Sequence, residues 1–337
     1  MIKKKQFSTE FVKIAERKGN MKKIIALCLC LIAVVSAVSG CSANTEKDNG
    51  KINIVTTIFP LYEWTKNIAG DKADVTLLVD NGVDLHSFQP SAEDIVKIST
   101  CDMFVYVGGE SDSWVDDALK EKVNKDMAVV NLLELLKNDI KEEETVEGMQ
   151  EEKEKEDEKE YDEHIWLSLR NARKCCDGIC KELVSADKKN KTSYESNNKD
   201  YSDKLNNLDN EYKTAVNSAK TKTVVFGDRF PFRYLADDYD IKYYAAFAGC
   251  SAETEASFKT IAFLADKVDE YKLNAIFKIE TSDDKIAKTI RENTKSKNQK
   301  ILTLDSMQNK TAKDIKNKIT YLSVMKNNLN TLKEGLN

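Results

Sequence analysis

The chain contains only two histidines, and each lies in a short polar signature rather than on an apolar stripe. His86 lies in the segment DNGVDLHSFQP (residues 80–90), and His164 lies in YDEHIWLS (residues 161–168). Neutral imidazole is a common protein ligand for zinc and other borderline metals. For either histidine alone, packing or capping is the simpler explanation. Together, in these settings, the two histidines predict a metal site.

Two acidic residues occupy comparable positions in the second half of the chain. Asp228 follows the apolar run 223–226, and Asp305 follows the run 301–304. Open α/β sheets bind their ligands at the carboxyl ends of strands, so four such ends would supply two nitrogen and two oxygen ligands. The alternatives are a turn or helix N-cap for Asp305 and an ion pair with a neighbouring arginine for Asp228.

The elements that must position these residues follow a regular order. Short apolar, β-branched runs alternate with helical patterns, which is typical of parallel sheets with helices on both faces. The predicted strands are Ile52–Ile58, Val75–Val79, Met103–Val107, Ala128–Leu132, Thr223–Phe226, Ile241–Ala246, Ala275–Ile279 and Ile301–Leu304. The predicted helices are Leu61–Ala69, Ala92–Ser99, Trp114–Lys120, Leu169–Val184, Arg233–Asp238, Thr254–Val268, Asp283–Arg291 and Ala312–Leu332. The pattern predicts two α/β lobes, residues 51–190 and 221–337.

Residues 191–220 separate the two lobes and contain neither proline nor glycine. Apolar residues recur there at helical spacing on an otherwise polar segment, which gives one apolar stripe. We therefore predict one long, rigid helix that joins the lobes and limits hinge motion between them.

The N-terminal region has the features of a secretion signal. Residues 21–40 contain two lysines and then an apolar stretch shorter than the ~20 residues that a spanning helix needs. They end at Cys41 in a lipobox-like sequence, so we expect cleavage there and lipid attachment to Cys41, with residues 41–50 as a flexible tether. Residues 1–20 do not fit a signal peptide, and we expect translation to start at Met21.

Charge is concentrated in one segment. The 337-residue chain has a net charge of −5, and residues 141–163 hold 13 Asp/Glu and 4 Lys. With so few apolar residues, this acidic segment is predicted to be a disordered loop, either a solvated linker or a weak collector of cations. The rest of the exported chain is nearly balanced, so no basic face for nucleic acid is expected.

Five cysteines remain in the chain after Cys41, and they are Cys101, Cys175, Cys176, Cys180 and Cys250. An odd number in an exported chain leaves a free thiol or an intermolecular bond. The spacing of Cys176 and Cys180 within a helical pattern does not suit a zinc knuckle, and we interpret the cysteines as buried or helix-surface residues.

The motifs around the histidines resemble those of zinc/manganese-binding lipoproteins that serve ATP-binding-cassette importers. Gly82, His86, Phe88 and Pro90 match a G-x-x-x-H-x-[FY]-x-P pattern, and Asp162, His164, Trp166 and Leu167 match D-x-H-x-W-L. The resemblance covers residues 51–337, including the opening segment VTTIFP at residues 55–60. It implies two α/β lobes bridged by one long helix, with the metal in the cleft between them.

The third ligand departs from the family pattern. The family has His or Glu a few residues before F-x-Y-L, seen here at residues 232–235. An ungapped match places Arg229 there, and a guanidinium cannot bind metal because it stays protonated. A shift of one residue makes Asp228 the third ligand, and Asp305 matches the fourth. The reserve candidates are Glu253 and Glu255, and the family also makes Glu280 a residue that lines the cleft.

The resemblance favours a non-enzymatic, monomeric receptor that binds Zn²⁺ and delivers it to a membrane permease. The same receptor for Mn²⁺ is the nearest alternative, because carboxylates suit manganese while nitrogen ligands favour zinc. A surface zinc hydrolase would need an open metal position and a general base, for which Glu163 is the candidate. An adhesin or structural lipoprotein is the remaining alternative.

Overall fold

The computed structural model describes residues 50–150, 161–251 and 255–337, and residues 51–337 form one compact unit. The predicted signal peptide, the lipidation site Cys41 and the reserve ligand Glu253 lie outside the described residues.

Two four-stranded parallel sheets form the two lobes, as predicted. The first sheet contains β1 (Ile52–Thr56), β2 (Ala73–Leu77), β3 (Met103–Tyr106) and β4 (Ala128–Asn131) in the order β2-β1-β3-β4. The second contains β5 (Thr223–Arg229), β6 (Lys242–Phe247), β7 (Ala275–Ile279) and β8 (Lys300–Leu304) in the order β6-β5-β7-β8. Because both sheets repeat one topology, each has its ligand-binding edge at the carboxyl ends of its strands.

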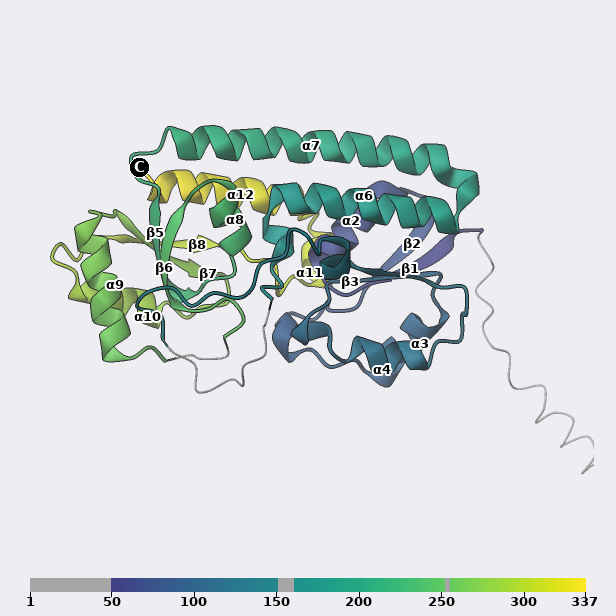
Figure 1. Ribbon diagram of the computed structural model, residues 1–337, viewed down its shortest axis with the longest axis horizontal. Helices are drawn as coiled ribbons and strands as arrows, with labels where there is room; N and C mark the ends of the chain where they lie inside the picture. Colours follow the sequence, from purple (N-terminus) through teal and green to yellow (C-terminus); the bar gives the residue numbers. More distant parts are fainter. Residues whose placement is uncertain (1–49, 151–160, 252–254) are drawn as a thin grey trace, which may run out of the picture. The chain divides into compact units, whose positions relative to one another are not determined.

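Helices cover both faces of each sheet (Figure 1). The first lobe has the α-helices α2 (Phe59–Ala69), α3 (Ala92–Thr100), α4 (Val115–Lys120), α5 (Leu132–Leu135) and α6 (Leu169–Ala186). It also has the short 3₁₀ turns η1 (Leu85–Ser87), η2 (Glu110–Asp112), η3 (Ile165–Leu167) and η4 (Lys188–Asn190). The second lobe has α8 (Arg233–Asp238), α9 (Phe258–Glu270), α10 (Lys285–Asn293), α11 (Ala312–Lys316) and α12 (Tyr321–Gly335).

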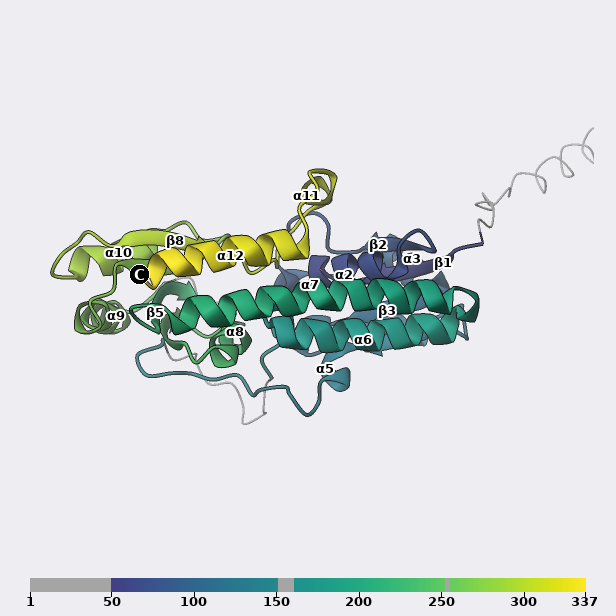
Figure 2. The ribbon, with the colours of Figure 1, turned by 90° about the horizontal axis from the view of Figure 1, so that it is seen from above.

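The predicted long helix is α7 (Lys191–Asn217), which lies along α6 beside the first sheet and along α12 beside the second (Figures 1 and 2). Its buried residues are Tyr194, Tyr201, Leu205, Leu208, Tyr212 and Val216. Inward-facing residues at helical spacing bury one stripe along the helix, and this stripe holds α7 against both lobes.

The predicted helix Ala312–Leu332 is wrong as a single element, because the chain breaks it into α11 and α12. Lys318 has a φ of 60°, a left-handed conformation that no helix can continue through. Thr320 then starts α12 with a capping box. Its side chain accepts from the backbone N–H of Ser323, and the Ser323 side chain accepts from the backbone N–H of Thr320.

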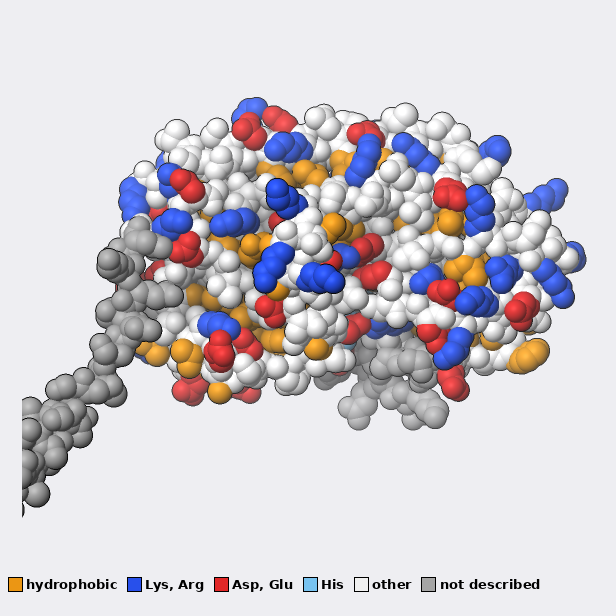
Figure 3. Space-filling model, turned by 180° about the vertical axis from the view of Figure 1, so that it is seen from behind, with side chains coloured by type: hydrophobic (Ala, Val, Ile, Leu, Met, Phe, Trp, Pro, Cys, Tyr) orange, Lys and Arg blue, Asp and Glu red, His pale blue; other side chains and the backbone are white. Residues whose placement is uncertain are grey.

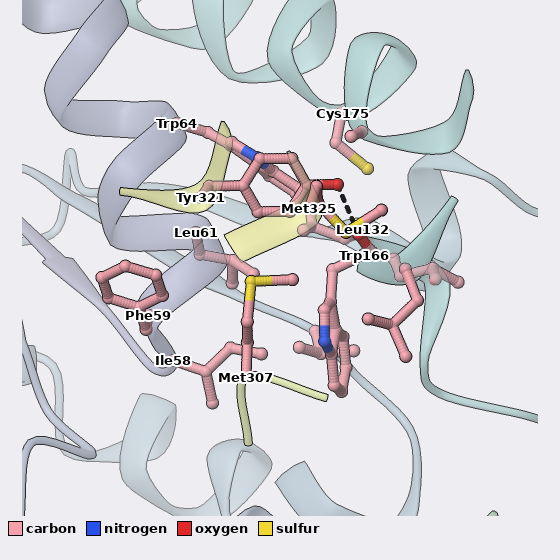
Figure 4. Packing of buried hydrophobic residues seen from close by; sticks show 14 of the residues in the cluster. Ile58, Phe59, Leu61, Trp64, Leu132, Trp166, Cys175, Met307, Tyr321 and Met325 are labelled. Carbon is pink, nitrogen blue, oxygen red and sulfur yellow. Dashed lines mark hydrogen bonds between the residues drawn. The ribbon is translucent and has the colours of Figure 1, made fainter. Parts of the chain in front are cut away.

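A buried aromatic junction connects the lobes at the start of α12 (Figure 4). Trp64 and Tyr321 pack edge to face with ring centroids 5.3 Å apart, and the Tyr321 hydroxyl donates to the carbonyl of Trp166 at 2.6 Å. The indole N–H of Trp166 donates to the carbonyl of Ser306 at 2.8 Å. The loop after His164 is thereby fixed to the loop after β8.

The prediction of a disordered acidic loop over residues 141–163 is wrong for residues 141–150 and for residues 161–163, where Asp162 and Glu163 are buried, while residues 151–160 lie outside the described residues. The backbone N–H of Gln150 donates to the carbonyl of Ala246 at 2.9 Å, and Met149 is 7% exposed. Gly148 lies against the ring of Phe263, where any side chain would collide. A few apolar residues and one close backbone approach therefore attach this part of the segment to the second lobe.

The surface carries charges of both signs. On the face shown in Figure 3, Lys/Arg and Asp/Glu side chains intermingle over both lobes. Within the described residues, no helix is both long and apolar enough to span a bilayer.

Candidate metal centre

His86 is presented by the 3₁₀ turn η1, which follows β2. The carboxylate of Asp84 caps this turn by accepting from the backbone N–H of His86 at 3.1 Å. The ring Nδ1 of His86 lies 2.7 Å from Ser111 Oγ, in η2 after β3. When Nδ1 donates in this contact, Nε2 keeps its lone pair, and Nε2 is buried without a partner among the described residues.

His164 lies at the start of η3 and is fully buried. One carboxylate oxygen of Asp162 accepts from the backbone N–H of His164 at 2.8 Å and from its ring Nδ1 at 2.9 Å. A carboxylate can only accept here, so the proton is on Nδ1 and the lone pair is on Nε2, which is the tautomer typical of metal-binding histidines. This Nε2 is also buried and has no partner among the described residues.

The two imidazoles face one space, with their ring centroids 5.5 Å apart. Burial, and then the neighbouring His164, lower the pKa of His86 to about 4. His86 is therefore neutral near pH 7 and available to a metal. Ser111 connects the two histidine loops, because its backbone N–H donates to the Glu163 carboxylate at 2.9 Å.

Cys250 supplies a third donor from the second lobe, just after β6. Its sulfur and one ring nitrogen of each histidine all lie within 4.8 Å of one another. Gly249 permits this approach, because a Cβ there would lie 3.1 Å from His164 Cε1 and 3.0 Å from the carbonyl oxygen of Phe230. Burial, reinforced by the carboxylate of Glu143, raises the pKa of the Cys250 thiol well above its usual value. His86, His164 and Cys250 form a group that could hold a metal, with ligands from both lobes.

Comparison with known proteins identifies the family of this chain. The family of the zinc-uptake complex component A periplasmic matches residues 54–335. The chain belongs to this family. The zinc-binding lipoprotein AdcA of Streptococcus pneumoniae R6 is 35% identical over 317 residues, which cover 93% of this chain and 61% of AdcA. The high-affinity zinc uptake system protein ZnuA of Bacillus subtilis is 32% identical over 320 residues, covering 93% of this chain and 96% of that protein.

Solved structures of family members have the same fold. The Zn(II)-bound ZnuA-like domain of S. pneumoniae AdcA matches with a TM-score of 0.68 and 32% identity, over 85% of this chain and 99% of that domain. The laminin-binding protein Lmb of Streptococcus agalactiae, a bifunctional protein with adhesin and metal-transporting activity, matches with a TM-score of 0.69 and 27% identity, over 85% of this chain and 100% of that protein. The chain spans only 61% of the length of the AdcA proteins, so a further part of those proteins has no counterpart in the match.

Asp228, predicted as the third ligand, does not join the group of His86, His164 and Cys250. It lies inside β5, which extends three residues beyond its predicted end. Its two carboxylate oxygens accept from the backbone N–H of Arg229 at 2.8 Å and of Ile279 at 3.3 Å. The side chain therefore bridges β5 and β7.

Asp305, predicted as the fourth ligand, also lies outside the group of His86, His164 and Cys250. It stabilises a turn instead, which was the alternative role predicted for it. Its carboxylate accepts from the backbone N–H of Met307 at 2.9 Å and pairs with Lys310. Glu280 accepts from the backbone N–H of Ser306 at 2.7 Å and from its hydroxyl at 2.9 Å. The carboxylates of Asp305 and Glu280 therefore stabilise the loop after β8. The reserve candidate Glu255 is exposed.

Arg229, which the ungapped match in the sequence placed at the third-ligand position, forms an ion pair with Asp84 at 2.8 Å. Burial alone would raise the pKa of Asp84, but the hydrogen bond and charge of Arg229 lower it below its usual value. The guanidinium is thereby held by a carboxylate of the other lobe. The sequence signal that was missed is Cys250 itself, a cysteine in a chain with an odd number of cysteines, placed just after a predicted strand.

Proposed function

We propose that this protein is a lipid-anchored receptor that captures Zn²⁺ outside the cell and delivers it to the permease of an ATP-binding-cassette importer. One observation carries the proposal. Two imidazoles, His86 and His164, have buried Nε2 atoms without partners among the described residues, and their rings lie 5.5 Å apart. Buried polar atoms are nearly always paired, so two unpaired nitrogens in contact range indicate that a cation is the missing partner.

The supports around the two rings favour a metal. Ser111 and Asp162 occupy Nδ1 of His86 and His164, respectively. Such contacts fix the tautomer and orientation of a histidine ligand and raise its basicity. They leave the histidines ready to bind without rearrangement of the first lobe.

Zinc is preferred over manganese in this proposal. Nitrogen ligands bind zinc more tightly than manganese along the Irving–Williams series. Family relatives carry zinc in their names, AdcA as a zinc-binding lipoprotein and ZnuA as a zinc uptake protein.

A metal at this position would be shared between the lobes, which gives the receptor a way to signal that it is loaded. The aromatic junction of Trp64, Trp166 and Tyr321 already restricts the lobes, so binding would adjust loops rather than swing a hinge. A permease that recognises both lobes would distinguish the loaded from the empty form by these loops.

Lipid anchoring through Cys41 rests on the sequence of residues 21–41, and AdcA of S. pneumoniae is named a lipoprotein. Hydrolysis is not favoured, because the chain belongs to a zinc-uptake family. Glu163 accepts from the backbone N–H of Ser111 through Oε1, while its Oε2 is buried without a partner among the described residues. Its role is to join the two histidine loops.

The proposal is tested by elemental analysis and calorimetry of the purified protein and of its His86→Ala and His164→Ala variants. We expect one zinc per chain in the parent and a loss of at least about 100-fold in zinc affinity for each variant. Removing a residue that hydrogen-bonds to a metal ligand costs about 10–100-fold in affinity, and removing the ligand itself should cost more. Thermal unfolding checks that the variants fold. Zinc binding weaker than micromolar in the parent would refute the receptor, and tighter manganese binding would change its cargo.

A further inference from the structure

We propose that Cys250 binds the captured ion through its sulfur, which makes the centre a thiolate and bis-imidazole site. The inference rests on the proposed function, since it names a ligand of the same ion. It follows from geometry, because the sulfur and one nitrogen of each histidine lie within 4.8 Å of one another. In a tetrahedral zinc site, bonds of about 2.0–2.3 Å place such ligand atoms roughly 3.3–3.7 Å apart. A contraction of at most about 1.5 Å would bring the three atoms to these separations.

The accessibility of Cys250 separates it from the other described cysteines. Cys101, Cys175, Cys176 and Cys180 are buried, whereas Cys250 is partly exposed and faces the histidines. Burial alone accounts for the first four as small apolar residues. It does not account for a thiol placed beside two buried imidazole nitrogens that lack partners among the described residues.

Among the described residues, Cys250 is the residue of the second lobe that groups with the two histidines within 4.8 Å, and the predicted ligands of that lobe have other partners. Arg229 is a cation already paired with Asp84. Asp228 is used by two backbone N–H groups, and Asp305 by a backbone N–H group and Lys310. Cys250 follows β6, the strand next to β5, so it reaches the same edge of the sheet as the position that Arg229 occupies.

The loop around Cys250 is built to hold the sulfur in place. Gly249 has no side chain, and its backbone therefore rests against the ring of His164. Glu143 accepts from the backbone N–H of Cys250 at 2.9 Å. The first contact brings the loop of Cys250 close to His164, and the second anchors the cysteine backbone to the acidic segment.

Binding through sulfur has a defined chemistry. The S–H bond of Cys250 breaks, its proton passes to water, and the thiolate forms a bond to the divalent ion, with no change in oxidation state. A soft thiolate favours zinc and cadmium over manganese, which prefers carboxylate oxygens. Cys250 would therefore set the selectivity of the receptor as well as its affinity.

The test is a titration of the reduced, metal-free protein with Co²⁺, which occupies zinc sites and reports its ligands by absorption. The parent is compared with Cys250→Ser, and Cys101→Ala serves as a matched control that removes a buried cysteine of the first lobe. We expect a near-ultraviolet thiolate-to-cobalt charge-transfer band in the parent and the control. In Cys250→Ser the band should be absent, and zinc affinity should fall by at least about 100-fold.

The outcomes separate the two proposals. If the parent binds Co²⁺ without a charge-transfer band and Cys250→Ser binds zinc as tightly as the parent, the sulfur ligand is refuted while the receptor stands. If neither protein binds Co²⁺ or Zn²⁺, both proposals are refuted. Thermal unfolding of Cys250→Ser without metal, with a midpoint equal to that of the parent, excludes misfolding as the cause of lost binding.

Discussion

The guanidinium of Arg229, at the end of β5, pairs with the carboxylate of Asp84, in the loop that presents His86, at 2.8 Å. Asp84 at the same time caps the turn that contains His86. One carboxylate therefore connects the second lobe to the backbone of a candidate metal ligand. The pair also neutralises a positive charge that would otherwise repel a cation at the neighbouring site.

This arrangement predicts the behaviour of Arg229→Ala. Zinc affinity should be kept or should rise, because a nearby positive charge is removed while Asp84 can still cap the turn. Stability of the metal-free protein should fall by about 1 kcal/mol, because a partly buried carboxylate loses its partner. Calorimetry and chemical denaturation measure the two effects. A strong loss of zinc affinity would show that Arg229 positions His86 rather than merely balancing Asp84.

Asp228 and Asp305 should prove dispensable for the metal. In Asp228→Ala and Asp305→Ala we expect zinc affinity within about threefold of the parent, because both carboxylates bind protein groups instead. Asp228→Ala should lower stability by about 1–3 kcal/mol, since it leaves the backbone N–H of Ile279 without an acceptor. Asp228→Asn, which retains an acceptor oxygen, is the matched control. If calorimetry finds that Asp228→Ala binds zinc as weakly as His164→Ala, Asp228 is the third ligand, as the sequence predicted.

The contrast between the histidines and Asp228 explains how far the sequence could lead. All eight strands were predicted, because apolar periodicity is a local property of the chain. His86 and His164 stood out because histidine is the rarest residue type of the chain and both histidines lie in recognisable signatures. The role of Asp228 depends on backbone groups of another strand, which no local pattern reveals.

Cys250 and the break between α11 and α12 were missed for related reasons. Cys250 meets His164 only because Gly249 packs against the imidazole ring from the other lobe, a contact between residues far apart in sequence. The break occurs at Lys318, a residue type with no preference for the left-handed conformation that it adopts. In both cases tertiary packing decides the outcome.

Glu143 should act as a positioning residue for Cys250. Glu143→Ala removes the acceptor of the Cys250 backbone N–H and is expected to weaken zinc binding about tenfold, in the range found for supports of metal ligands. Glu143→Gln keeps an acceptor oxygen and should stay within about threefold of the parent, as calorimetry can measure. If both variants lose affinity equally, the charge of Glu143 matters and the hydrogen bond does not.

Glu63 should give stability a dependence on pH that is independent of the metal site. Burial raises the pKa of Glu63, opposed by a hydrogen bond from the backbone N–H of Tyr321. A raised folded-state pKa means that its favourable contribution is complete below the unfolded pKa of about 4.3 and is lost as pH rises through the folded value. Glu63→Gln should therefore gain stability relative to the parent from acidic to neutral pH, by about 1.4 kcal/mol for each unit of raised pKa. Denaturation curves that differ by a constant amount at every pH would contradict this.

Exchanging the sulfur of Cys250 for oxygen should change which metal the receptor prefers. Cys250→Asp keeps an anionic donor in the cleft but makes it hard rather than soft. We expect zinc affinity to fall more than manganese affinity, so that the ratio of the two drops by at least about tenfold, because thiolates favour zinc and carboxylates favour manganese. Competition calorimetry of both ions with the parent, Cys250→Asp and Cys250→Ser measures this ratio. Cys250→Ser is the control, because it removes the sulfur without adding a carboxylate. It should weaken zinc binding, but it should lower the ratio of zinc to manganese affinity less than Cys250→Asp does. An unchanged ratio in Cys250→Asp would mean that selectivity is set by His86 and His164 alone.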